Sequence, residues 1–294
     1  MRILITGGSG FLGQALASAL LERGDEVLIL SRNAANNAQN KMASHWIQSL
    51  DAIDKPIDAV FNLTGANLFS RPWTKARKRE LRDSRIALTQ TLVAWLNKQT
   101  QAPRVLLSGS AIGIYGDQGE HALTEQSEQG KDWAANLVAD WEAAAANAGT
   151  RIVNLRTGLV LGDGGLLQPL RPVFKLGLGG SLGDGRFWYS WIHLQDWVSA
   201  ALFLLDLESA NGPYNLTAPT PVRYKEFAKG LGKALHRPVW LTPPAWILKL
   251  MLREQASLLL SSTKAMPLRL QQAGFQWAYP NLPEALAELF KPAP

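Results

Sequence analysis

Glycines that let the backbone approach a phosphate group follow the first apolar segment of the chain. Residues 2–6 form a short apolar run, residues 7–13 contain four glycines, and an apolar-periodic helix leaves this turn. Such a strand, turn and helix are typical of a dinucleotide-binding crossover, in which backbone N–H groups and the positive helix N-terminus face the pyrophosphate. The alternative is a tight turn without a ligand. The residues predicted to contact the nucleotide here are Thr6, Gly7, Gly10, Phe11, Leu12 and Gly13.

The end of the second predicted strand, residues 26–30, indicates which nucleotide binds. An Asp or Glu about 20 residues beyond the glycines would bind the ribose 2′-hydroxyl of NAD. This chain has Ser31 and Arg32 there instead. Because a guanidinium pairs well with a phosphate, Arg32 favours NADP(H) as the cofactor. The alternative is an arginine that is simply exposed to solvent.

Two further predicted strands, residues 58–63 and 104–110, end in small or polar residues. Their carboxyl ends are expected at the same edge of a parallel sheet, beside the nucleotide. A basic helix lies between them from Lys75 to Arg85, and its charged face is expected to be solvated, with Arg85 pointing toward the nucleotide. The strand-end residues predicted to lie beside the cofactor are Leu63, Thr64, Gly65 and Ser108.

The composition indicates one large domain, or a large domain with a smaller lobe. The 294 residues are 47% hydrophobic, which allows a sizeable core. No cysteine is present, which excludes disulfides and thiolate metal sites and suits the cytoplasm. The four scattered histidines predict no metal site. The longest apolar run, near residues 198–205, is too short to span a membrane, and the net charge of +6 is too mild to predict nucleic-acid binding.

Short motifs spread along the whole chain together form one pattern. They are Thr6-Gly7-x-x-Gly10-x-x-Gly13, Asn62-Leu63-Thr64-Gly65, Ser108-x-Ser110 with Tyr115-Gly116, Arg156-Thr157-Gly158, Gly177-Leu178-Gly179-Gly180, Trp191-Ile192-His193 with Asp196, Gly212-Pro213-Tyr214-Asn215, and Gly274-Phe275. This pattern resembles the extended short-chain dehydrogenase/reductases of the nucleotide-sugar epimerase/dehydratase class, and in particular their SDR39U1-like "epimerase family" branch. The resemblance implies an α/β fold: a Rossmann-type, doubly wound parallel sheet with a smaller, mostly helical C-terminal substrate lobe.

The resemblance also assigns chemical roles by position. In this class a Ser binds the substrate oxygen, and a Tyr with a Lys four residues later transfers the proton; Ser110 matches the Ser. The helix that should carry the other two residues has Trp133 and Leu137 in their places. An indole is a hydrogen-bond donor without basic function, and leucine has no polar group. The usual acid/base pair is therefore absent, although Leu137, together with Arg156, is still expected on the cofactor side.

Three residues are candidates to replace the missing pair, and each has a structural alternative. Tyr115 lies in a glycine-flanked loop near Ser110 and is the provisional proton donor; otherwise it packs on the nicotinamide or the substrate. His193 is alternatively a hydrogen-bonded structural histidine. Asp196 precedes a helix and is alternatively its N-cap.

A glycine-dense segment, residues 164–190, is expected to approach the substrate. It carries Arg171, Lys175 and Arg186, which predict a small polar substrate with an anionic, for example phosphorylated, group. In epimerases an Arg commonly lies three residues before the Ile-His pair, and Tyr189 occupies that place here. This departure counts against a nucleotide sugar as the substrate.

The predicted division places the dinucleotide-binding domain at residues 1–163, with residues 191–217 returning to it. Residues 164–190 and 218–294 form the substrate lobe. An apolar helix predicted over residues 245–252 packs in the core of that lobe, or alternatively forms the face of a homodimer.

The sequence therefore predicts an NADP(H)-binding epimerase or oxidoreductase that acts on a small molecule without the usual Tyr–Lys pair. A binding protein is the alternative from another class. In that case NADP(H) occupancy controls closure of the second lobe and contact with a partner, and no substrate is turned over.

Overall fold

The computed structural model describes residues 1–34, 43–165, 167–241 and 254–291. Its centre is a seven-stranded sheet whose strands all run parallel, in the order β11-β7-β5-β4-β1-β2-β3. The strands are β1 (Arg2–Thr6), β2 (Glu26–Leu30), β3 (His45–Ile47), β4 (Ala59–Asn62), β5 (Val105–Ala111), β7 (Arg151–Thr157) and β11 (Gly212–Leu216). This sheet confirms the predicted Rossmann-type α/β fold.

The strand order reverses beside β1, which pairs with β2 on one side and with β4 on the other. In open α/β sheets the ligand crevice forms outside the carboxyl ends of the strands at such a reversal. The glycine turn that follows β1 therefore lies where a nucleotide is expected. The strand β3 pairs with β2 at the edge of the sheet, in a segment for which the sequence analysis predicts no strand.

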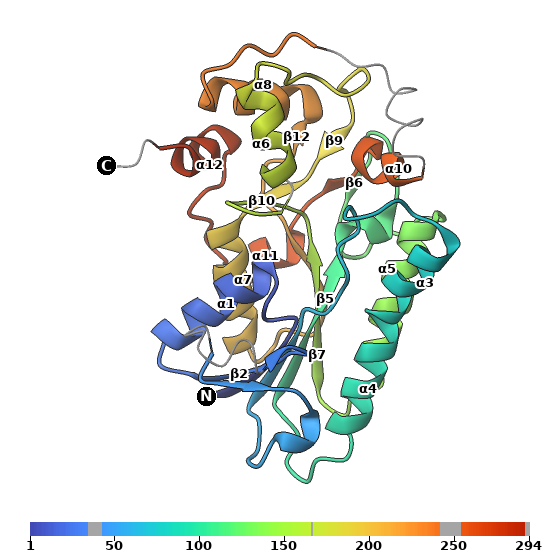
Figure 1. Ribbon diagram of the computed structural model, residues 1–294, viewed down its shortest axis with the longest axis vertical. Helices are drawn as coiled ribbons and strands as arrows, with labels where there is room; N and C mark the ends of the chain where they lie inside the picture. Colours follow the sequence, from blue (N-terminus) through green and yellow to red (C-terminus); the bar gives the residue numbers. More distant parts are fainter. Residues whose placement is uncertain (35–42, 166, 242–253, 292–294) are drawn as a thin grey trace.

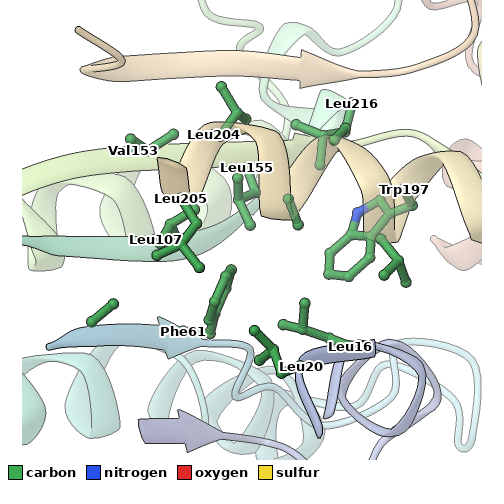
Figure 2. Packing of buried hydrophobic residues seen from close by; sticks show 14 of the residues in the cluster. Leu16, Leu20, Phe61, Leu107, Val153, Leu155, Trp197, Leu204, Leu205 and Leu216 are labelled. Atoms are coloured by element: carbon green, nitrogen blue, oxygen red, sulfur yellow. The ribbon is translucent and has the colours of Figure 1, made fainter. Parts of the chain in front are cut away.

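Helices cover both faces of the sheet (Figure 1). On one face lie α1 (Phe11–Glu22) and α7 (Leu194–Asp206), and on the other lie α4 (Ile86–Leu96) and α5 (Trp133–Ala145), with α3 (Lys75–Asp83) beside them. Because successive residues of a strand point to opposite faces of the sheet, each strand contributes side chains to two apolar cores, one on each face. Figure 2 shows the first core, where Leu16 and Leu20 of α1 face Phe61 of the sheet and Trp197 of α7, all fully buried.

The C-terminal region is mostly helical and has an apolar core of its own, in which Phe174, Tyr189, Tyr224 and Phe227 are buried. The remaining elements are η1 (Leu50–Ala52), η2 (Ile112–Tyr115), β6 (Ala122–Leu123), β8 (Leu159–Leu161), α6 (Leu167–Lys175), β9 (Trp188–Tyr189), β10 (Trp191–His193), β12 (Val222–Arg223), α8 (Tyr224–Ala234), α10 (Gln255–Leu260), β13 (Lys264–Ala265), α11 (Leu268–Gln272) and α12 (Leu282–Leu289).

Two predictions concern this second half of the chain. The strand β11 pairs with β7 at the edge of the main sheet, as its sequence predicted. The helix predicted over residues 245–252, and with it the homodimer face, lies outside the described residues. Among those that are described, no helix combines the length and apolar character needed to cross a bilayer.

Candidate cofactor and substrate site

A groove of about 1060 Å³ lies at the reversal of the strand order. Its walls are the glycine turn, the ends of β2 and β4, and the helices α3 and α4. The sequence-predicted residues that line it are Thr6, Gly7, Gly10, Ser31, Arg32, Leu63, Thr64 and Gly65. Residues from three separate strand ends therefore meet in one cavity, as the sequence predicted.

The glycine turn has a geometry that other residues would disturb. Gly7 has a φ of +74°, and a Cβ on it would lie 2.4 Å from the carbonyl oxygen of Leu63. A Cβ on Gly13 would lie 2.5 Å from the carbonyl oxygen of Gly7, so α1 packs directly against the turn. Since both contacts are with backbone atoms, neither position can accept a side chain without moving the turn.

The N-terminus of α1 is suited to an anion. The helix starts at Phe11 after the N-cap Gly10, no side chain caps it, and its first turn has no acidic residue. Its first N–H groups and the helix dipole can therefore serve a phosphate. Leu12 packs against the sheet core, while the ring of Phe11 is covered by the loop that holds Gly164, so these two contribute backbone rather than side chains.

The helix α3 supplies a cation that sequence reasoning missed. Ala76, Arg79, Glu80 and Asp83 line the groove from one helical face, and Arg79 adds a second guanidinium to that of Arg32. The Arg77 guanidinium donates to Glu80 at 2.7 Å and lowers the pKa of that carboxyl. The spacing of three to four residues could have indicated that these side chains share one helical face. The charged face of the helix was instead expected to be solvated.

Arg85 does not line the groove, which corrects its predicted contact with the nucleotide. Its guanidinium donates to the carbonyl oxygens of Leu81 at 3.2 Å and Ala66 at 3.1 Å. It packs beneath Gly65, where a Cβ would lie 2.9 Å from its Cζ, and burial lowers its pKa to about 10. Arg85 therefore supports the floor of the groove.

A buried ion pair occupies the end of the sheet where the catalytic Ser was predicted. Ser110 Oγ donates to Glu142 Oε1 at 2.5 Å, and Arg156 binds both oxygens of the same carboxylate, at 2.8 and 2.9 Å. Although burial alone lowers it, the pKa of Arg156 is raised by the carboxylate of Glu142. Ser110 therefore cannot donate to a carbonyl oxygen in this state, and Arg156 is committed to Glu142 rather than to the cofactor.

The Tyr115 hydroxyl, the predicted proton donor, is held by two protein partners in this geometry. The residue is fully buried, and its hydroxyl donates to Asn215 Oδ1 at 2.7 Å while accepting from Arg156 Nη1 at 3.0 Å. Burial raises the pKa of this hydroxyl further from neutrality. Tyr115 therefore links β7 to β11 and reaches neither cavity.

The other two candidate replacements are also structural. His193 Nδ1 accepts from the backbone N–H of Gln195 and so caps α7, while its Nε2 lies 3.1 Å from Glu288. Asp196 is therefore not the N-cap of this helix. Its two carboxylate oxygens accept the N–H groups of Ala278 at 2.7 Å and Tyr279 at 2.9 Å, which fixes the segment before α12.

A second cavity, of about 1310 Å³, opens between the two halves of the molecule and is called here the lobe cavity. It is lined by Trp73, Lys78, Asp117, Asp132, Trp133, Ala134, Gly183, Asp184, Phe187, Glu254, Ser257, Leu260 and Ser261. Trp133, which stands in the place of the usual Tyr, contacts Trp73 edge-on, with 4.6 Å between ring centroids. The Lys78 ammonium lies 5.0 Å from the Trp133 centroid and pairs with Glu254.

Several predicted residues lie outside both cavities. Leu137 and Ser108 are buried and line neither, and Ser108 Oγ has no hydrogen-bond partner among the described residues. Arg171 pairs with Asp163 at 2.9 Å and covers the ring of Phe290. The cations of the 164–190 segment, Arg186 and Lys175 included, are absent from the lining of the lobe cavity.

Comparison with known proteins places the whole chain among similar sequences and structures. Residues 3–217 match the NAD dependent epimerase/dehydratase family, and residues 243–289 match a domain of unknown function, DUF1731. The epimerase family protein YfhF of Bacillus subtilis is 36% identical over 297 residues, covering 98% of each chain.

Two solved structures extend this comparison. The human epimerase family protein SDR39U1 (isoform 2), determined with NADPH, superposes with a TM-score of 0.92 at 33% identity and covers 99% of both chains. A nucleoside-diphosphate sugar epimerase from Corynebacterium glutamicum gives a TM-score of 0.78 at 29% identity. That alignment covers 99% of the present chain and 58% of the Corynebacterium chain.

Proposed function

Because the chain belongs to the NAD-dependent epimerase/dehydratase family, we propose that it binds NADP(H) in the groove beside β1 and oxidises or reduces a small polar substrate in the lobe cavity. The observation that carries the proposal is the groove itself. An uncapped helix N-terminus, a glycine turn that cannot accept side chains and two guanidinium groups line one crevice at the reversal of strand order.

The preference for NADP(H) over NAD(H) rests on the charge at the end of β2. Arg32 and Arg79 line the groove there, and Ser31 adds a hydroxyl. A 2′-phosphate gains charge-assisted hydrogen bonds from such a group, whereas a 2′-hydroxyl gains little. The relative solved with NADPH is consistent with this preference.

The residues of this chain would hold the cofactor and the substrate in place, and none of them is assigned a proton-transfer role. The glycine turn and the α1 N-terminus would bind the pyrophosphate, and Arg32 would bind the 2′-phosphate. Trp73, Trp133 and Phe187 would exclude water from the lobe cavity. When bound, the cofactor supplies reversible hydride exchange at its nicotinamide ring.

Calorimetric titration with NADPH and NADH tests the proposal. NADPH should bind more tightly than NADH. Arg32→Ala should weaken NADPH binding by about tenfold to a hundredfold and leave NADH binding nearly unchanged, because only NADPH has a 2′-phosphate for the Arg32 guanidinium. Lys75→Ala is the matched control, since Lys75 is an exposed cation of α3 that does not line the groove. An equal loss for both nucleotides would contradict the role of Arg32.

A second candidate function is a sensor in which cofactor binding controls the contact between the two halves. Gln255 of α10 donates to the carbonyl oxygens of Leu68 and Arg71, each at 2.8 Å, and so ties the C-terminal half to the loop before α3. An enzyme would oxidise bound NADPH in the presence of its substrate. A sensor would never oxidise it, and NADPH binding would only change the protease sensitivity of residues 164–190. The cytoplasm is the proposed compartment for either.

A further inference from the structure

Carboxylates line the proposed cofactor groove together with its guanidinium groups. The charged side chains that the described part of the chain brings to the groove are Arg32, Arg79, Glu80 and Asp83, two cations and two anions. A carboxylate repels a phosphate at short range. The two anions of the groove therefore have no role in binding a 2′-phosphate.

Glu80 lies at the centre of the helical face that α3 turns toward the groove. Ala76, Glu80 and Asp83 follow one another at intervals of four and three residues, which places them on one side of the helix, and all three line the groove. The side chain of Glu80 is 46% exposed. A nucleotide in the groove can therefore reach its carboxylate.

Two guanidinium groups hold this carboxylate in place. Arg77, whose side chain is only 5% exposed, donates to Glu80 Oε1 at 2.7 Å. Arg71 Nη2 lies 3.1 Å from Oε1 and 3.2 Å from Oε2. Each oxygen of a carboxylate can accept two hydrogen bonds. Within the described residues Oε2 accepts only the one from Arg71, so it can accept a second from a ligand hydroxyl.

The carboxylate of Glu80 is charged and interacts with Arg32. The hydrogen bond from Arg77 lowers the pKa of Glu80, and the charges of Arg71 and Arg32 lower it as well. Glu80 is therefore ionised at neutral pH. Arg32, which is proposed to bind the 2′-phosphate, thus shares its end of the groove with a fixed negative charge.

The end of β2 lacks the acidic residue that dinucleotide-binding crossovers use for NAD. In those crossovers an Asp or Glu accepts a hydrogen bond from the ribose 2′-hydroxyl. Here Ser31 and Arg32 follow Leu30, the last residue of β2, and both line the groove. Glu80 brings a carboxylate to the same groove from α3 instead.

From these contacts we infer that Glu80 is a second determinant of cofactor choice. Its available carboxylate lone pair accepts the ribose 2′-hydroxyl of NAD(H), and its charge opposes the 2′-phosphate of NADP(H). Arg32 and Glu80 therefore act in opposite directions, and the groove accepts both dinucleotides with a limited preference for NADP(H). The inference rests on the proposed function and extends it, since it names a second cofactor and the residue that admits it.

Calorimetric titration of NADPH and NADH into the unaltered protein and into Glu80→Gln tests the inference. In the unaltered protein the dissociation constant of NADH should exceed that of NADPH by no more than about tenfold. Glu80→Gln keeps an acceptor for Arg77 but removes the charge. It should tighten NADPH binding about threefold to tenfold and weaken NADH binding about threefold, because a neutral amide oxygen accepts the 2′-hydroxyl less strongly.

A control variant and the salt concentration separate this effect from a structural one. Glu22→Gln removes an exposed carboxylate at the end of α1 remote from the glycine turn and should change neither affinity. Raising the ionic strength from about 0.05 M to about 0.5 M screens exposed charges, so the gain in NADPH affinity of Glu80→Gln should shrink to less than about twofold. A displaced loop or helix would change the binding of both nucleotides alike at either salt concentration.

Three outcomes overturn the inference and leave the proposed function in place. The first is a preference of the unaltered protein for NADPH above about tenfold. The second is a ratio of the two dissociation constants that is the same in Glu80→Gln and in the unaltered protein. The third is a gain in NADPH affinity that persists in full at the higher ionic strength. The proposed function fails in a different way, through absence of binding of either nucleotide, and that result removes the inference with it.

Discussion

The buried pair between Glu142 and Arg156 gives the most quantitative prediction. The guanidinium contacts both carboxylate oxygens, at 2.8 and 2.9 Å, and the side chains are only 13% and 9% exposed. Glu142→Gln keeps an acceptor for Ser110 but leaves the charge of Arg156 buried without a counter-ion. Removing one partner of a buried pair typically costs about 3–5 kcal/mol. Because the glutamine oxygen still accepts one hydrogen bond, we expect about 3 kcal/mol here.

Urea unfolding followed by far-ultraviolet circular dichroism measures this cost. Arg156→Met and the double variant complete a cycle, and the double variant should lose less stability than the two single changes predict together, by about 1–3 kcal/mol. Glu128→Gln is the control, since this exposed carboxylate should change stability by less than about 0.5 kcal/mol. A cost below about 1 kcal/mol for Glu142→Gln, or an additive cycle, would refute the account of a desolvated pair.

Two other predictions concern the glycine turn and a buried phenol. Gly13→Ala places a Cβ 2.5 Å from the carbonyl oxygen of Gly7, so the affinity for NADPH measured by calorimetry should fall at least about tenfold. Gly113→Ala is the control, because a Cβ there meets open space and should leave the affinity unchanged. Equal affinities of the two variants would contradict the close packing at Gly13. Burial raises the pKa of the Tyr189 hydroxyl above its value in the unfolded chain. The free energy of unfolding should therefore be unaffected by this group below about pH 10 and should fall as the pH rises further, by up to about 1.4 kcal/mol per pH unit. Tyr189→Phe should flatten this alkaline decline in urea unfolding, and an unchanged slope would argue against it.

The sequence was sufficient for the parts of the molecule that local chemistry determines. The glycine turn after β1 and the charge at Arg32 were predicted because both depend on residues close together in the chain. The parallel sheet was expected because the motifs along the chain resemble those of the extended short-chain dehydrogenase/reductases. The edge strand β3 was missed because its three residues, His45–Ile47, carry little β pattern of their own and are ordered by pairing with β2.

The chemical roles were harder to predict because they depend on distant partners. The Tyr115 hydroxyl is held away from both cavities by Asn215 and Arg156, which lie 100 and 41 residues away in the chain. Glu142 was not recognised as the acceptor for Ser110, which is 32 residues distant. The lobe cavity likewise combines residues from Trp73 to Ser261, a juxtaposition that only the tertiary fold produces.

Hydrogen–deuterium exchange with and without NADPH tests the central claim most directly, because it reports where the nucleotide binds. Saturating NADPH should protect the amides of residues 7–13 and 63–66 together with those around Arg32, since these segments line or adjoin the groove. The amides of the C-terminal helix α12 should be unaffected. No protection of the glycine turn at millimolar NADPH, or protection confined to other segments, would contradict the account.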